Sequence, residues 1–291
     1  ISIVFPENRT CQDGFSPPPH AAIFYLGPVM VGNETLQQDK WEGLYTDFLK
    51  SVENVIINDL NANYISIALS PALQDPRPFT WSGYTIEPAT NYVNDLRKGD
   101  DYLFRSLDKK QRQDLNRAKK RGFAVQLGGK KEINQIMDLM TNRYEEQSKI
   151  GTVSQLYLTD IYEKFMDNIA VFVTRVEGEI VTGLIVLHYK DTLYSWIGNP
   201  KPRMPVSPSP NDLMAWEVIR FGCEQKFKFH VTLSAAGNKR LHSYYASKFD
   251  PELSIRFNAK KSSLASRIFE KGYSNLLKPL RGKMKQFMTE K

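Results

Sequence analysis

The sequence contains little cysteine and little histidine, and this excludes several kinds of site. Its 291 residues include only two cysteines, Cys11 and Cys223, and four scattered histidines. Two distant cysteines cannot form a disulfide framework, and no His, Cys and carboxylate residues have the spacing of a zinc site. We therefore expect a metal-free site, and we interpret Cys223, which lies in a helical pattern, as a core thiol.

Long apolar runs are also missing. No stretch reaches the roughly 18 apolar residues of a spanning helix, and no secretory leader pattern opens the chain. With 41% hydrophobic and 24% charged residues, the composition is that of a globular protein with a core. We expect a cytoplasmic protein without a transmembrane segment.

Positive charge is abundant and clustered. The net charge is +7, but residues 105–131 and 256–291 each carry +8, so the remaining chain sums to −9. Such segments suit phosphate-rich partners such as nucleotides, CoA, tRNA or anionic lipid, although solvated helix faces explain them equally well. Arg112 and Arg117 can bind phosphate in a bidentate manner, which makes them candidates for substrate binding.

Hydrophobic periodicity predicts an α/β protein with a mixed sheet. It indicates helices over 35–58, 100–107 and 108–121, with Asp108 as an N-cap and Gly122 just beyond the last helix. From Phe123 onward we expect a strand, two helices, a three-strand meander, a helix, a strand, a helix and a strand. The meander strands are Ala170–Val176, Ile180–Tyr189 and Thr192–Ile197, and helices at 212–227 and 239–249 flank the strand at 229–234.

Five motifs occur in an order that resembles one family. The stretch at 81–96 (WSGYTIEP, then YVNDL) leads into a basic helix at 107–122 (LDKKQRQDLNRAKKRG). Further motifs lie at 25–28 (YLGP), 209–217 (SPNDLMAWE) and 245–251 (YASKFDP). Together they resemble the FemAB-like proteins, which are GNAT-type transferases related to peptidoglycan-bridge aminoacyltransferases and BioF2-like acetyltransferases. The resemblance covers about residues 21–260.

The resemblance implies two GNAT-like domains. The first would occupy 1–98 and lack its opening strand and helices, 99–122 would be a basic connecting helix, and 123–291 would form the second domain with a C-terminal helix. The implied activity is transfer of an acyl or aminoacyl group to an amine of a nucleotide- or lipid-linked precursor. No tightly bound cofactor is implied, and the donor is either aminoacyl-tRNA or acyl-CoA. The implied partners are a phosphate-bearing substrate, tRNA and the periphery of an anionic membrane.

Two departures from the family pattern keep alternatives open. Ala246 occupies the position of a family lysine, and Lys248, two residues on, would point about 200° away on a helix. The loop at 199–210 has five prolines and no glycine, whereas a CoA pyrophosphate is usually cradled by the amides of a glycine-rich turn. The alternatives are a CoA-dependent N-acetyltransferase of the same fold and an inactive binding module.

The candidate residues follow from these patterns. Ser209 and Asn211 lie at a helix start whose amides can hold an anion, although a simple helix cap explains them too. Trp81 with Tyr84, and Tyr194 with Trp196, can stack on a base or sugar; the latter pair alternates on one strand and should share a face. The candidates for catalysis are Asp212, Tyr245, Lys248 and His242. No unique base is assigned, and no Ser/His/Asp or Cys/His set is placed for a covalent intermediate.

Overall fold

The chain divides into two compact units. The computed structural model describes residues 25, 27, 36–59, 62, 64–146, 153–202, 206–232 and 245–263. The first unit contains 23–89 and the chain from Arg256 onward, and the second contains 90–255. These limits differ from the predicted division at 98 and 122, because two long strands, β2 (Thr85–Asp95) and β8 (Glu252–Ser262), each have residues in both units. That each unit is a GNAT-like domain stays a prediction.

The first unit packs a long helix and a short helix around β1 and β8. Helix α1 (Gln38–Glu53) continues as the π-helical η1 (Asn54–Asp59), followed by β1 (Tyr64–Ala68) and α2 (Arg77–Trp81). Strands β1 and β8 are antiparallel, with Tyr64 opposite Ser262. The three- and four-residue spacing of apolar residues in α1 places Tyr45 and Leu49 in the core, as the predicted helix at 35–58 requires. The hydrophobic periodicity predicted no helix where α2 forms.

The second unit is a mixed sheet covered by helices. After the last residues of β2, it contains η2 (Leu96–Lys98), α3 (Asp100–Ser106) and α4 (Lys109–Lys120). It continues with β3 (Ala124–Gly128), α5 (Lys130–Glu146), α6 (Gln155–Lys164) and η3 (Met166–Asn168). The remaining elements are β4 (Ile169–Val176), β5 (Glu179–Tyr189), β6 (Thr192–Gly198), α7 (Pro210–Glu224) and β7 (Phe229–Thr232). Residues 245–249 are also helical.

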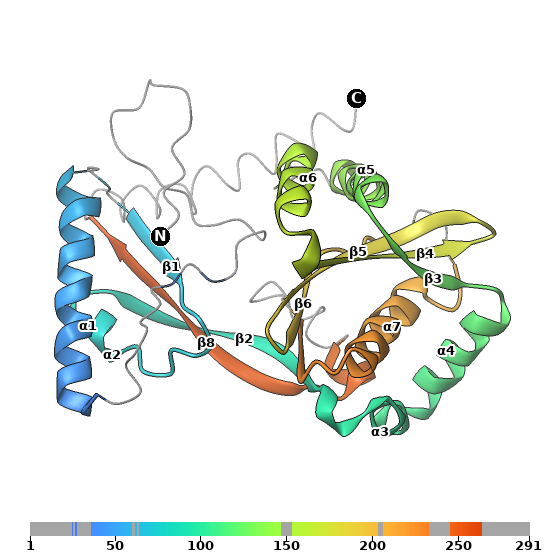
Figure 1. Cartoon of the computed structure of the whole chain (residues 1–291), viewed down its shortest axis with the longest axis horizontal. Helices are drawn as coiled ribbons and strands as arrows, with labels where there is room; N and C mark the ends of the chain where they lie inside the picture. Colours follow the sequence, from blue (N-terminus) through green and yellow to red (C-terminus); the bar gives the residue numbers. More distant parts are fainter. Residues whose placement is uncertain are drawn as a thin grey trace, which may run out of the picture. The chain divides into compact units, whose positions relative to one another are not determined.

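The strand order in the second unit is β2-β7-β6-β5-β4-β3. All neighbouring strands with a described register are antiparallel except β6 and β7, which are parallel. The predicted α/β class with a mixed sheet is therefore confirmed. Helices α5 and α6 cover one face of this sheet, and α3, α4 and α7 lie on the other (Figure 1).

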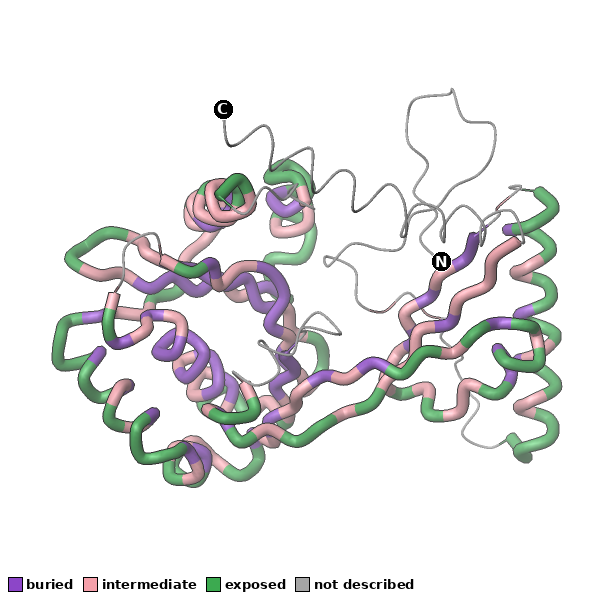
Figure 2. Tube along the Cα trace, turned by 180° about the vertical axis from the view of Figure 1, so that it is seen from behind, coloured by how far each residue is buried: buried purple, intermediate pink, exposed green. Residues whose placement is uncertain are grey.

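Local sequence signals determine where α4 begins and ends. The Asp108 carboxylate accepts a 2.7 Å hydrogen bond from the backbone N–H of Gln111, and Gly122 follows the helix with φ of 77°. The inner face of α4 contributes Leu115 and Ala118 to the core that α7 shares. Figure 2 colours the buried residues of α7 purple. The cations of α4 are consequently left on its outer face.

Candidate functional site

Strands β6 and β7 end at the same edge of the second unit's sheet. They are parallel and joined through α7, with Thr192 opposite Phe229 and Ser195 opposite Thr232. Strand β7 ends at Thr232, whereas β6 continues to Gly198. Ligands of open α/β sheets bind outside the carboxyl ends of such strands, where the positive end of the crossover helix also lies. This carboxyl edge is therefore the candidate site.

The loop after β6 is hydrogen-bonded to both β5 and α7. Gly198 has φ of 127°, and a Cβ atom there would lie 2.3 Å from the Gly183 carbonyl oxygen, so only glycine fits. The Asn199 N–H donates to that same carbonyl at 2.5 Å. The side-chain amide of Asn211, in the first turn of α7, donates to the carbonyls of Asn199 and Pro200, each at 3.3 Å. The loop and the start of α7 are thereby held together.

Asp212 and Lys248 form an ion pair beside this helix start. Lys248 Nζ lies 2.5 Å from Asp212 Oδ2, and the two side chains are 27% and 5% exposed. A carboxylate this buried needs a paired cation, and Lys248 provides one. Lys248 has three donor hydrogens, so it can bind this carboxylate and an anionic ligand group together. Ser209 is the N-cap residue of α7, although its side chain makes no capping hydrogen bond.

Tyr245 lies in the same helical turn as Lys248. Burial, with a smaller contribution from the Asp212 carboxylate, raises the pKa of Tyr245 to about 12, while a hydrogen bond from the Asn199 side chain acts in the opposite direction. The phenol is consequently protonated at neutral pH. It can donate a hydrogen bond or a proton, but because it is not deprotonated at neutral pH it does not act as a general base.

The predicted phosphate-binding arginines of α4 are engaged within the protein. Arg112 donates to the carbonyls of Arg105 and Leu107, at 2.5 and 2.8 Å, and so satisfies the end of α3. Arg117 pairs with Asp114 three residues before it. The exposed face of α4 also carries Lys109, Lys110 and Lys120. Lys119 pairs with Glu217, and Arg121, just beyond the helix, donates to the Ser207 carbonyl.

In the aromatic pair on β6, Trp196 is buried and Tyr194 is partly buried. A β-bulge between β5 and β6 leaves Trp196 without a residue directly opposite, since Val186 faces Ser195 and Ile185 faces Ile197. Trp196 is only 9% exposed, and burial raises the pKa of the partly buried Tyr194. The prediction of one shared face assumed strict alternation, which the bulge interrupts.

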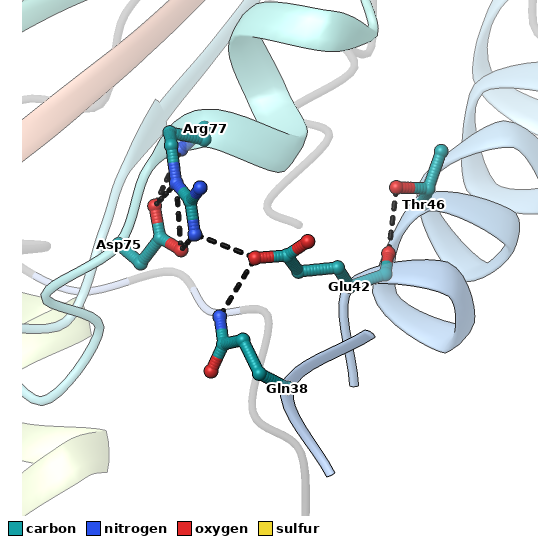
Figure 3. Close-up of polar contacts among 5 residues, drawn as sticks. All are labelled: Gln38, Glu42, Thr46, Asp75 and Arg77. Atoms are coloured by element: carbon teal, nitrogen blue, oxygen red, sulfur yellow. Dashed lines mark hydrogen bonds and ion pairs between the residues drawn. The ribbon is translucent and has the colours of Figure 1, made fainter. Parts of the chain in front are cut away.

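The aromatic pair of the first unit has two different environments. Tyr84 is 4% exposed and packs edge-on against Phe79, with ring centroids 5.4 Å apart, so it belongs to the core rather than to a stacking surface. Trp81 is 54% exposed, and the Arg77 guanidinium lies 5.4 Å from its ring centroid. Figure 3 shows that Arg77 also binds Asp75 and Glu42, which holds this guanidinium in place.

His242 lies outside the described residues, so its predicted role stays a prediction. Within the described ranges, no group of three or more His, Cys, Asp or Glu residues could hold a metal ion. In those same ranges no helix is long and apolar enough to cross a membrane. Burial raises the pKa of the Cys223 thiol to about 11, which fits a core thiol.

The structure also brings together two residues that sequence reasoning missed. Ser195 Oγ on β6 lies 2.8 Å from His230 Nε2 on β7, and both side chains are buried. The two residues are 35 positions apart, and their contact depends on the register of two parallel strands. No sequence signal specifies that register.

One family model matches part of the chain. Residues 109–240 match the family model described as an acetyltransferase (GNAT) domain. No curated protein shows significant similarity to the chain.

Solved structures share the fold at low sequence identity. FemX is 12% identical with a TM-score of 0.58, over 81% of this chain and 79% of its own. The C-terminal domain of a putative lysylphosphatidylglycerol synthetase from Agrobacterium fabrum is 14% identical with a TM-score of 0.53, over 80% and 77%. L-PGS from Bacillus licheniformis is 14% identical with a TM-score of 0.52 over the same shares. At such identities these likenesses show the fold alone.

Proposed function

We propose, on the premise that residues 109–240 form a GNAT-type acetyltransferase domain, that this chain transfers an acyl or aminoacyl group from an activated donor to an amine. One observation carries the proposal: the Lys248–Asp212 pair, Tyr245 and the start of α7 gather at the carboxyl edge of the parallel strands. Anion-binding groups and a protonated phenol at one edge suit acyl transfer, because negative charge develops there on a carbonyl oxygen.

The chemistry assigns a role to each group. The amine nitrogen attacks the donor carbonyl carbon, the C–O bond of an ester or the C–S bond of a thioester breaks, and the leaving group takes up a proton. The positive end of the α7 dipole and the Lys248 ammonium stabilise the developing oxyanion, while Asp212 holds Lys248 in position. Tyr245 donates a hydrogen bond to the leaving atom. The amine's proton passes to a base that these residues do not identify.

Two features favour a nucleotide-bearing donor other than CoA. The five prolines at 199–210 remove amide donors from the loop that would cradle a CoA pyrophosphate. The outer face of α4 carries lysines suited to a phosphate backbone. Aminoacyl-tRNA is therefore the favoured donor, and the amine of a nucleotide- or lipid-linked precursor is the favoured acceptor.

One rival reading is CoA-dependent N-acetylation, which the acetyltransferase description of the matched domain favours. A second rival is a binding module without turnover, which Ala246 favours.

A donor-binding screen by thermal shift separates these readings. The panel contains acetyl-CoA, CoA, charged and uncharged tRNA, and UDP-sugars. A ligand at 100 times its Kd should stabilise the fold by about 2.7 kcal/mol. We expect a shift with charged tRNA and none with CoA, and we expect Lys248→Met to reduce it while Arg77→Met, in the first unit, preserves it. A saturable shift with CoA alone would overturn the aminoacyl proposal in favour of acetylation.

A further inference from the structure

Three buried polar side chains lie on three neighbouring strands of the second unit's sheet. They are Asn94 on β2, His230 on β7 and Ser195 on β6, which are 4%, 2% and 8% exposed. Asn94 and His230 are directly opposite in antiparallel register, so their side chains share a face, and His230 contacts Ser195 at 2.8 Å. We call these three residues the polar row.

Stability does not explain why the polar row contains His230. Buried polar atoms lose their water, and a core regains that loss only where each atom finds a partner. Within the described part of the chain, His230 Nδ1 has no hydrogen-bond partner, and the neighbouring Thr232 Oγ1 has none either. Apolar side chains at these positions would avoid this penalty. Polar residues retained against stability are expected where they serve function.

The first end of the polar row holds the helical turn at 245–249. The side-chain amide of Asn94 donates a 2.9 Å hydrogen bond to the carbonyl of Phe249, the last residue of that turn. Carbonyls at a helix end have no partner within the helix, so Asn94 supplies one from β2. The same turn carries Tyr245 and Lys248, and the Tyr245 and Phe249 ring centroids lie 6.0 Å apart.

The second end of the polar row lies where the parallel strands stop pairing. Ser195 is the last residue of β6 with a partner on β7. Beyond it, β6 leads through Gly198 to the loop that Asn211 fastens to α7. The Ser195–His230 hydrogen bond therefore joins β6 and β7 immediately before the site begins.

We propose that Asn94 and His230 are positioning residues for acyl transfer. Asn94 sets the helical turn that carries Tyr245 and Lys248, and His230, through Ser195, sets the end of β6 beneath the α7 start. Neither residue contacts the reacting atoms. The inference rests on the proposed function, and it adds two residues that the transfer chemistry itself does not require.

The first test measures the position of the turn without any ligand. Asn94→Asp keeps the side-chain shape but removes the donated hydrogen bond, and Asn94→Leu removes both polar atoms. We expect hydrogen exchange in the peptide covering 245–249 to accelerate at least about tenfold in both variants. Asn91→Asp is the matched control, since Asn91 is a buried asparagine three residues earlier on the same strand. Unchanged exchange in that peptide in both Asn94 variants would overturn the role of Asn94.

The second test uses transfer rates with labelled aminoacyl-tRNA and an amine acceptor, corrected for the folded fraction. Misplacement of catalytic groups by about 1 Å can lower a rate roughly 100-fold. We expect kcat to fall about 10- to 100-fold in Asn94→Asp and His230→Leu, with KM changed less than about threefold. His230→Gln, which can still reach Ser195, should recover most of the rate. Equal losses in Asn91→Asp, or full kcat in Asn94→Asp, would contradict the inference.

The two tests separate failure of the inference from failure of the proposed function. If the wild-type protein transfers no group from any donor, the proposed function fails, and the exchange measurement still decides whether Asn94 holds the turn. If wild-type transfer occurs and the Asn94 and His230 variants match it, the inference alone fails.

Discussion

The Arg77 group of the first unit and the Lys248 group of the second use similar side chains in opposite surroundings. Arg77 pairs with Asp75 and Glu42 while its own side chain is 54% exposed. Lys248 pairs with Asp212, whose side chain is 5% exposed at a helix start. Exposed pairs contribute little and respond to salt, whereas a buried pair constrains both partners. The difference between the two groups is therefore burial: the proposed site contains the ion pair whose carboxylate is buried, at the start of α7.

The largest expected contrast between the two regions concerns glycines. Gly198 and Gly83 both have positive φ, but a Cβ at Gly198 would meet the Gly183 backbone at 2.3 Å, whereas at Gly83 the nearest atoms lie 3.9 Å away. We expect Gly198→Ala to lower the free energy of unfolding by about 4 kcal/mol and Gly83→Ala by about 1 kcal/mol. Urea denaturation measures both. Equal losses would show that the loop leaving β6 is not held as tightly as described.

The next effect concerns pH. Burial lowers the pKa of His230 to about 4, whereas an unfolded histidine titrates near 6.5. The unfolded chain therefore binds the proton first, and the stabilising effect of a neutral His230 is complete above pH 6.5 and is lost as pH falls toward 4. The difference in unfolding free energy across this window is roughly 3 kcal/mol.

Thermal unfolding between pH 7.5 and 4 measures this loss, with His230→Gln as the reference that removes the titrating group facing Ser195 and Asn94. The carboxylates titrate in both proteins, so their contributions to the pH dependence cancel in the comparison. Parallel stability curves for the two proteins would show that His230 is not held neutral by burial.

Removing one cation from each unit should give a smaller difference in unfolding free energy. Lys248→Met removes the cation paired with the buried Asp212 carboxylate, and we expect a loss of about 2 kcal/mol in unfolding free energy, below the full penalty of a buried pair because Lys248 is partly exposed. Arg77→Met should produce no loss beyond that of a surface substitution. Denaturation at 0.05 and 0.5 M salt measures both. A larger loss of unfolding free energy in Arg77→Met than in Lys248→Met would contradict the claim that the buried pair contributes more than the exposed one.

The smallest expected effect concerns buried hydroxyls without partners. Thr232 Oγ1 in the second unit and Ser82 Oγ in the first both lack a hydrogen-bond partner among the described residues. Thr232→Val and Ser82→Ala should each stabilise the fold by about 1 kcal/mol or less. Only Thr232→Val should also lower the rate of transfer, because Thr232 ends β7 at the site. Equal effects on transfer would remove the distinction between the regions.

Local patterns in the sequence predicted much of the fold. The cap at Asp108, the stop at Gly122 and the meander of β4, β5 and β6 depend on neighbours in sequence, which periodicity and turn chemistry can reveal. The short helix α2 was missed, because a proline-rich aromatic segment gives no helical period.

The candidate site was predictable only residue by residue. Asp212, Tyr245 and Lys248 were each candidates, but the ion pair joins positions 36 residues apart through tertiary packing. The Asn94–Phe249 hydrogen bond spans 155 positions, and no local pattern encodes it. Tyr84, by contrast, was a stacking candidate from its motif, but its ring packs against Phe79 in the core.

Transfer of a labelled aminoacyl group from tRNA to an amine, measured in the wild-type protein and in Lys248→Met, tests the central claim most directly. The account predicts transfer by the wild type and a loss of roughly 100-fold or more in Lys248→Met at equal folded fraction, with Arg77→Met unchanged. Transfer that persists at the wild-type rate in Lys248→Met would contradict the assignment of the site to the carboxyl edge of β6 and β7.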